Sequence, residues 1–286
     1  MLPNYDSPTD LKAILDSRGM AMQKKFGQNF LINSSARQKL AESLDLSEND
    51  SVWEVGPGLG SLTTEILKRG AKLTAFEIDR GFVNFLTEEI MSEFPNQLKI
   101  VSGDFLKTWK NELDTNGQAK KFFGNLPYNV AATIMADLIS SQIRFEKCVI
   151  TVQKEVAQRI CAKNDSEDYS SFSVLCQWAY DVKPLMDLGS SSFWPKPNVN
   201  SRAVIMTKKD DFPNCENPVL FLKMLRAVFA NRRKTIKNNL NNLTQNPQIT
   251  DKILLDAGIE SSIRAETLDV KTLLHLSDCI NKEGLK

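Results

Sequence analysis

Short segments rich in β-branched and aromatic residues alternate with longer helical stretches through the middle of the chain, and this alternation restricts the possible folds most. The segments expected to form strands are Val52–Val55, Leu73–Glu77, Leu98–Val101, Phe122–Asn125 and Val149–Val152. Since strands separated by helices connect through right-handed crossovers, this order predicts a parallel sheet with helices packed on it, an α/β fold. The β-prone stretches 182–188 and 203–207 are expected to close the sheet as an antiparallel hairpin.

The N-terminal stretch carries the signals of a helix. Ser7 can cap it, Pro8 suits its first position and Gly19 can end it, which predicts a short exposed helix. A second helix is expected over 34–44. We treat residues 1 to about 25 as a basic extension of the α/β domain and assign it no role.

After Lys209 the composition shifts to a linker and then to short helical segments, for example 219–229 and 270–280. The asparagine-rich stretch 238–246 is interpreted as a polar turn. We therefore predict two domains, an α/β domain over 1–209 and a small all-helical domain over 210–286.

Composition excludes several classes of protein. The hydrophobic and charged fractions, 42% and 25%, are typical of a globular protein. No apolar run is long enough to span a membrane and no signal-peptide pattern is present, so a soluble cytoplasmic protein is expected. The five cysteines never form a C-x-x-C pair, and we expect neither a disulfide framework nor a metal site. The single histidine, His275, fits a packed helix face better than a catalytic role.

Basic residues are concentrated in one stretch although the formal net charge is only +1. The segment 223–237 contains six basic residues and no acidic one. This pattern is typical of a helix and turn that contact RNA phosphates, and a solvated basic surface is the alternative. The candidate RNA-binding residues are Arg226, Arg232, Arg233, Lys234 and Lys237.

A glycine-rich turn follows the first expected strand, in Glu54-Val55-Gly56-Pro57-Gly58-Leu59-Gly60. Glycines at Gly56 and Gly58 allow a tight turn and a close approach to a nucleotide-like cofactor. Glu77 ends the next strand, where a carboxylate can accept hydrogen bonds from both hydroxyls of a ribose. A plain turn and a dinucleotide dehydrogenase are alternatives, but G-x-G-x-G differs from the G-x-G-x-x-G that binds a pyrophosphate, which favours S-adenosylmethionine.

The third strand is followed by Gly103-Asp104-Phe105. Asp104 can accept a hydrogen bond from the adenine amine of the cofactor, while Phe105 or Leu106 packs against the ring. The alternative is that Asp104 only caps a turn.

Asn125-Leu126-Pro127-Tyr128 follows the fourth strand, at the edge of the sheet where ligands of α/β proteins bind. An adenine amine is a poor nucleophile, so a methylating site must hold it close to the methyl group with its hydrogens directed to acceptors. The Asn125 side-chain oxygen and the Leu126 carbonyl can be these acceptors, Pro127 fixes the chain, and Tyr128 offers a stacking face. Phe193 is the candidate for a second face, and the base must be flipped out or lie in a single-stranded loop. An Asx-capped proline turn is the structural alternative.

With these motifs, the sequence resembles the ribosomal RNA adenine dimethyltransferase family, in the branch that acts on small-subunit RNA. The resemblance spans nearly the whole chain and rests on eight ordered blocks: Phe26–Leu31, Glu54–Gly60, Glu77–Asp79, Gly103–Asp104, Asn125–Asn129, Gln153–Ala157, Phe193–Pro197 and Asn231–Lys234.

The resemblance implies a Rossmann-like class I S-adenosylmethionine-dependent methyltransferase sheet with a small all-helical C-terminal domain. It implies N6-dimethylation of two adjacent adenosines in a hairpin loop near the 3′ end of 16S rRNA, within a 30S assembly intermediate, by a monomer. By position, the cofactor contacts are Asn29, Leu31, Gly56, Glu77, Asp104 and Asn125. Four further residues of the same motifs are added as expected cofactor contacts: Gln28, Gly58, Ile78 and Phe105. The adenine is framed by Asn125, Leu126, Pro127, Tyr128 and Phe193.

Three other functions are considered. A 23S rRNA adenine methyltransferase of the antibiotic-resistance type shares the cofactor and adenine motifs, but the Arg232-Arg233-Lys234 block and the complete helical tail argue against it. A DNA amino-methyltransferase usually carries a larger target-recognition domain. A non-catalytic ribosome assembly factor would not need Glu77, Asp104 and Asn125 intact.

Overall fold

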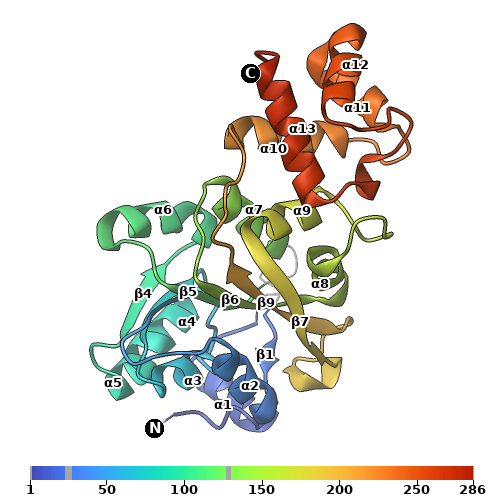
Figure 1. Cartoon of the computed structure of the whole chain (residues 1–286). Coiled ribbons are helices and arrows are strands. Elements are labelled where there is room, and N and C mark those ends of the chain that lie inside the picture. Colours follow the sequence, from blue (N-terminus) through green and yellow to red (C-terminus); the bar gives the residue numbers. More distant parts are fainter. Residues whose placement is uncertain (1, 23–27, 127–129, 286) are drawn as a thin grey trace. The chain divides into compact units, whose positions relative to one another are not determined.

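The computed structural model describes residues 2–22, 28–126 and 130–285 of the chain, which divides into two compact units (Figure 1). The first comprises Met1–Asp137, Arg144–Ala157 and Lys183–Lys208, and the second comprises Leu138–Ile143, Gln158–Val182 and Lys209–Lys286. The last segment of the second unit begins at the linker expected from composition. The second unit also contains 138–143 and 158–182, which lie between strands of the sheet in sequence and are not marked by any change in composition.

Among the described residues, a seven-stranded sheet of order β4-β3-β2-β5-β6-β9-β7 belongs to the first unit except for the first three residues of β7. Pairing is parallel from β4 to β6, and β9 runs antiparallel to β6. The strands are β2 (Ser51–Val55), β3 (Lys72–Glu77), β4 (Leu98–Ser102), β5 (Lys121–Asn125), β6 (Lys147–Gln153), β7 (Tyr180–Leu188) and β9 (Ser201–Lys208). The α/β prediction and its five central strands are confirmed.

A separate short pairing was not predicted. Strand β1 (Phe30–Leu31) pairs antiparallel with β8 (Phe193–Trp194), with Leu31 opposite Phe193. The rings of Phe30 and Trp194 stack, with their centroids 6.1 Å apart. This pairing brings two motifs from distant parts of the sequence together.

Several helices of the first unit begin at short polar side chains that cap them. Asn33 caps α2, Asp79 caps α4 and Asp104 caps α6. The helical segments are α1 (Pro8–Ser17), α2 (Ser34–Ser43), α3 (Thr63–Leu67), α4 (Arg80–Phe85), the π-helix η2 (Leu86–Ile90), α5 (Met91–Glu93), α6 (Phe105–Asn116) and the 3₁₀ turn η3 (Ser190–Ser192). Helices α7 (Ala131–Ser140) and α8 (Lys154–Cys161) each run from the first unit into the second.

The N-terminal helix is short, as predicted, and exposed over most of its residues, but one face is buried. Ser7 caps α1 and Pro8 begins it, as expected, but Leu11 and Leu15 are buried in the hydrophobic core of the first unit. Their spacing of four residues places both on one face of the helix, and this face packs inward.

The second unit is helical in its C-terminal part. Its helices are α9 (Ser171–Ala179), α10 (Pro218–Val228), α11 (Ile236–Thr244), α12 (Pro247–Asp256), the 3₁₀ turn η4 (Ala265–Thr267) and α13 (Val270–Lys282). The polar-turn interpretation of 238–246 is wrong, because most of the stretch lies in α11, where Asn239 and Leu240 face the core. His275 is exposed on α13 and not on its packed face.

No helix in the described part of the chain is long and apolar enough to cross a membrane. The described residues also contain no group of three or more His, Cys, Asp or Glu side chains that could hold a metal ion.

Candidate functional site

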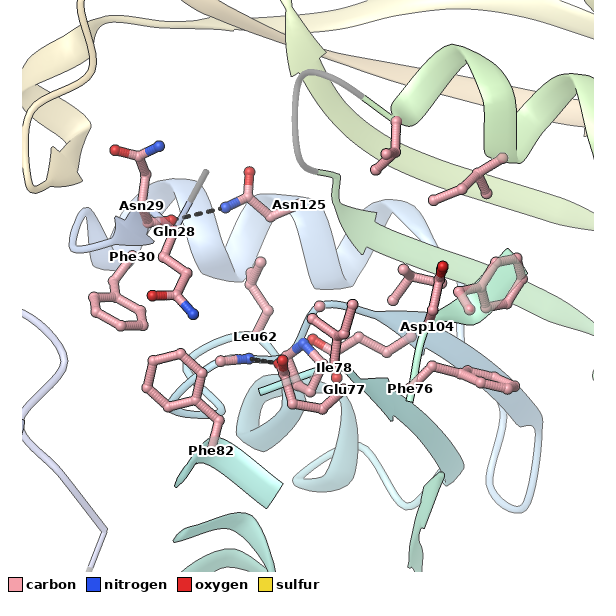
Figure 2. A pocket seen from close by; sticks show the side chains of 18 of the residues that line it. Gln28, Asn29, Phe30, Leu62, Phe76, Glu77, Ile78, Phe82, Asp104 and Asn125 are labelled. Atoms are coloured by element: carbon pink, nitrogen blue, oxygen red, sulfur yellow. Dashed lines mark hydrogen bonds between the residues drawn. The ribbon is translucent and has the colours of Figure 1, made fainter. Parts of the chain in front are cut away.

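A cavity of about 310 Å³ lies at the carboxyl ends of the parallel strands (Figure 2). Val55 at the end of β2 is opposite Phe76 of β3 and Gly124 of β5. The next residues of these three strands therefore emerge at one edge of the sheet: Gly56, Glu77 and Asn125. This edge is where ligands of open α/β sheets bind, and the cavity is large enough for a small organic molecule.

The glycine-rich turn forms one wall of the cavity. Gly56, Gly58 and Gly60 have φ values of +72°, +59° and +82°, a region that favours glycine. A Cβ atom on Gly58 would lie 3.0 Å from the Phe30 ring. The Gly58 amide donates a hydrogen bond of 3.0 Å to Oε2 of Glu77, which holds the turn against the end of β3.

Glu77 and Glu54 are buried carboxyl groups that both line the cavity. Burial raises the pKa of Glu77 to about 7, although its oxygens accept hydrogen bonds from the amides of Gly58 and Asp79. Burial raises the pKa of Glu54 to about 8, and the nearby charge of Glu77 adds to this effect, while the Thr63 hydroxyl donates to Glu54 at 2.7 Å. A cationic ligand would favour the ionised form of both groups.

The charge of the cavity wall distinguishes two kinds of cofactor. Glu54, Glu77 and Asp104 line it, whereas the described lining residues include no Lys, Arg or His. In their ionised form these carboxyls would repel a pyrophosphate and attract a sulfonium or ammonium group. The lining therefore favours a cationic cofactor over a dinucleotide.

Asp104 and Phe105 lie where β4 passes into α6. Oδ1 of Asp104 accepts a hydrogen bond of 3.1 Å from the Leu106 amide, so this residue does cap the helix. It also lines the cavity, together with Phe105 and Leu106. The buried Phe105 ring packs edge-on against Phe76, 4.9 Å between centroids. The capping and the ligand-binding interpretations of Asp104 are therefore compatible.

Residues 28 and 29 connect the two sides of the cavity (Figure 2). Nε2 of Gln28 donates to Oδ2 of Asp79, at 3.1 Å, after the end of β3. The Asn29 carbonyl accepts a hydrogen bond of 3.0 Å from Nδ2 of Asn125, at the end of β5. This bond orients the Asn125 amide with its nitrogen toward Asn29, which leaves Oδ1 as the acceptor end.

The predicted site residues are partly brought together. Those that line the cavity are Gln28, Asn29, Leu31, Gly56, Gly58, Glu77, Ile78, Asp104, Phe105 and Asn125. Leu126 and Phe193 are buried and do not line it. Phe193 is the strand partner of Leu31, so its backbone lies next to the cavity wall. Pro127 and Tyr128 lie outside the described residues.

Sequence reasoning assigned no role to several lining side chains: Phe30, Glu54, Ser61, Leu62, Phe76, Phe82, Val130 and Ile134. Four of these residues could have been found from their positions next to the sequence motifs. Val130 and Ile134 follow the Asn125-Leu126-Pro127-Tyr128 motif at helical spacing, and Ser61 and Leu62 continue the glycine-rich turn into α3.

The predicted RNA-binding residues lie on α10, the turn that follows it and the start of α11. Arg226, Arg232, Arg233 and Lys234 are exposed, and Lys237 is half-buried and forms an ion pair with Asp251 at 2.6 Å. We call residues 229–235 the basic turn. Nη2 of Arg232 donates to the Glu167 carbonyl at 2.8 Å.

The basic turn is fixed from inside the unit by Asn239. The buried Nδ2 of Asn239 donates to the carbonyls of Val228, at 2.8 Å, and Asn231, at 3.0 Å. This buried amide therefore ties the last residue of α10 and one residue of the basic turn to α11.

Comparison with known proteins gives consistent matches over nearly the whole chain. The family model described as "Ribosomal RNA adenine dimethylase" matches residues 19–282. "Ribosomal RNA small subunit methyltransferase A" of Treponema denticola is 43% identical over 97% of this chain and 96% of its own length. The protein of the same name from Treponema pallidum is 38% identical, over 97% and 98%.

Among solved structures, a dimethyladenosine transferase from Plasmodium falciparum is similar, with a TM-score of 0.78 and 24% identity. The likeness covers 88% of this chain and 98% of that one. At this identity the likeness shows the fold alone.

Proposed function

This chain belongs to the ribosomal RNA adenine dimethylase family, and from that premise we propose that it dimethylates N6 of two adjacent adenosines near the 3′ end of 16S rRNA. S-adenosylmethionine is the proposed methyl donor, and the target adenosines lie in a hairpin loop. One observation carries the proposal. The Asn125 amide stands at the edge of a carboxyl-lined cavity, fixed there by the Asn29 backbone.

The small-subunit substrate is supported by the relatives. Those that share 38% to 43% identity over nearly their full lengths are named for the small subunit. A 30S assembly intermediate in the cytoplasm is the proposed substrate particle, and the enzyme is proposed to act on it as a monomer.

The residues of the cavity fit S-adenosylmethionine, which supplies an electrophilic methyl group when it is bound. Each oxygen of Glu77 accepts one amide hydrogen bond and has a second lone pair for a ribose hydroxyl. Asp104 is the proposed acceptor for the adenine amine of the cofactor, with Phe105 and Ile78 against its ring. The carboxyls of the cavity suit the positive charge of the molecule.

The target adenine is proposed to be held by acceptors and not by a strong base. Oδ1 of Asn125 and the Leu126 carbonyl accept the two amine hydrogens, so that the nitrogen lone pair is directed at the methyl group. Pro127, Tyr128 and Phe193 complete the proposed frame. Because the proton can leave after transfer, no histidine is needed.

RNA is proposed to bind through phosphate contacts in the second unit. Arg226, Arg232, Arg233, Lys234 and Lys237 form the proposed phosphate-binding surface. The target base must leave its stack to enter the first unit's site.

Transfer of labelled methyl groups tests the proposal. Unmethylated small subunits, large subunits and DNA are each incubated with the enzyme and labelled S-adenosylmethionine, followed by nucleoside analysis. We expect dimethyladenosine in small-subunit RNA alone. Label only in large-subunit RNA would replace the proposal with the resistance-type function, and no label in any substrate would favour a non-catalytic assembly factor.

A further inference from the structure

Tyr5, in the N-terminal extension to which sequence analysis assigned no role, contacts the glycine-rich turn. Its side chain is buried, and its hydroxyl donates a hydrogen bond of 2.9 Å to the Leu59 carbonyl. Leu59 lies between Gly58 and Gly60. The contact is close, because a Cβ atom on Gly60 would lie 3.5 Å from the Tyr5 hydroxyl oxygen. Burial raises the pKa of Tyr5 far above its usual range, so the hydroxyl keeps its proton and donates.

Arg37 of α2 connects this contact to a second segment that lines the cavity, β1. Its side chain is almost fully buried, and Nη1 donates to the Leu31 carbonyl at 2.9 Å. Nη2 forms an ion pair with Asp6, and the guanidinium carbon lies 5.8 Å from the centre of the Tyr5 ring. We call Tyr5, Asp6 and Arg37 the anchor cluster.

The anchor cluster therefore holds two backbone segments to which none of its own residues belongs. One is the turn at Leu59, and the other is β1 at Leu31, whose side chain lines the cavity. None of the three residues of the cluster lines the cavity. They are thus placed to position the cofactor site without touching a ligand in it.

We propose that the anchor cluster pre-organises the cofactor site, with Tyr5 and Arg37 as positioning residues for S-adenosylmethionine binding. The inference rests on the proposed cofactor. A turn with three glycines at positive φ has many alternative conformations, and the Tyr5 hydroxyl selects one of them. If fewer molecules hold the binding-competent turn, the apparent dissociation constant rises in proportion.

The test is Tyr5→Phe, which removes the hydroxyl and keeps the ring in the core. We expect S-adenosylmethionine to bind about fivefold more weakly in calorimetry, as for loss of one neutral hydrogen bond. The KM for the cofactor rises by a similar factor while kcat at saturation stays unchanged, because bound cofactor restores the turn. Without cofactor, the Gly60 amide, which donates to the Pro57 carbonyl at 2.9 Å, should exchange its hydrogen faster.

Tyr169→Phe is the matched control. The Tyr169 hydroxyl is also buried and has no hydrogen-bond partner within the described residues, and it belongs to the second unit. This variant should bind the cofactor as the wild type does. Arg37→Lys is the second test variant and should also weaken binding, since lysine does not reproduce the two separate guanidinium nitrogens that contact Leu31 and Asp6.

The outcomes separate the two proposals. If the wild-type protein does not bind S-adenosylmethionine, the proposed cofactor is wrong. If the wild type binds and both Tyr5→Phe and Arg37→Lys bind equally well, the anchor cluster has no positioning role. A loss of affinity in Tyr169→Phe equal to that in Tyr5→Phe would likewise overturn the inference, because the effect would then be general.

Discussion

The side-chain amide of Asn125 has two functions in the proposed site, one at each end. Its nitrogen donates to the Asn29 carbonyl, and its oxygen is the proposed acceptor for an adenine amine. One planar amide can do both only because its two ends are chemically different. An ionised aspartate, which has the same size, could only accept.

Asn125→Ala should therefore lower the rate of methyl transfer by a factor of about 100 or more. Without the amide the target amine is no longer held in line with the methyl group, and a small misplacement of a reacting group lowers the rate by about this factor. RNA binding should persist, since the phosphate-binding surface is unchanged. The measurement is methyl incorporation together with filter binding of small-subunit RNA. Asn111→Ala, at an exposed position of α6, is the control, and full activity in Asn125→Ala would refute the acceptor geometry.

Glu54 and Glu77 make cofactor binding depend on pH. Their pKa values are raised to about 8 and about 7, so both are partly protonated at neutral pH. A cationic cofactor binds the ionised form, so its affinity should rise between about pH 6 and pH 8.5, by up to tenfold per pH unit for each proton released. Calorimetry across this range should show the rise, and Glu54→Gln should remove its upper part. Affinity independent of pH in the wild type would contradict this assignment.

At the scale of elements, the sequence predicted the strands and the residues at their ends, because β-rich segments and turn motifs are local patterns. It did not predict the β1–β8 pairing, which depends on contacts between Phe30 and Trp194 from distant parts of the chain. The anchor cluster was missed for the same reason. An isolated Tyr5 carries no local signal that its hydroxyl reaches Leu59.

The basic turn presents two neighbouring arginines, Arg232 and Arg233, that are both exposed. Changing Arg232 and Arg233 to Ala together should weaken RNA binding and lower the slope of log affinity against log salt by about 2, since each arginine is expected to neutralise about one phosphate. Filter binding at several salt concentrations measures this slope. Lys107→Ala, at an exposed position of α6, is the control. An unchanged slope in the double variant would remove the basic turn from the RNA-binding surface.

At the scale of the whole molecule, buried carboxyls set the dependence of stability on pH. Because Glu54 and Glu77 have raised pKa values, their contribution is complete below the usual value of about 4.5 and is lost as the pH rises to about 8. Asp50 has the opposite sign. Hydrogen bonding to Lys121 lowers its pKa to about 2, so its contribution is present above the usual 3.8 and is lost in stronger acid.

The cofactor-free protein should therefore melt at a higher temperature at pH 5 than at pH 8.5, by about 5 °C or more. Thermal unfolding followed by circular dichroism measures this difference. Glu54→Gln should reduce the difference by stabilising the protein at high pH. A melting temperature that rises from pH 5 to pH 8.5 would contradict the raised pKa values of these two carboxyls.

Strand order also has a consequence for synthesis on the ribosome. The buried strand β6 ends at Gln153, but its neighbour β9 begins only at Ser201. A nascent chain that has not yet extended past β9 therefore exposes one edge of an apolar strand to pairing with other chains, the situation that chaperones relieve. Proteolysis of stalled nascent chains should show protection of β6 only after residue 208 has left the ribosomal tunnel.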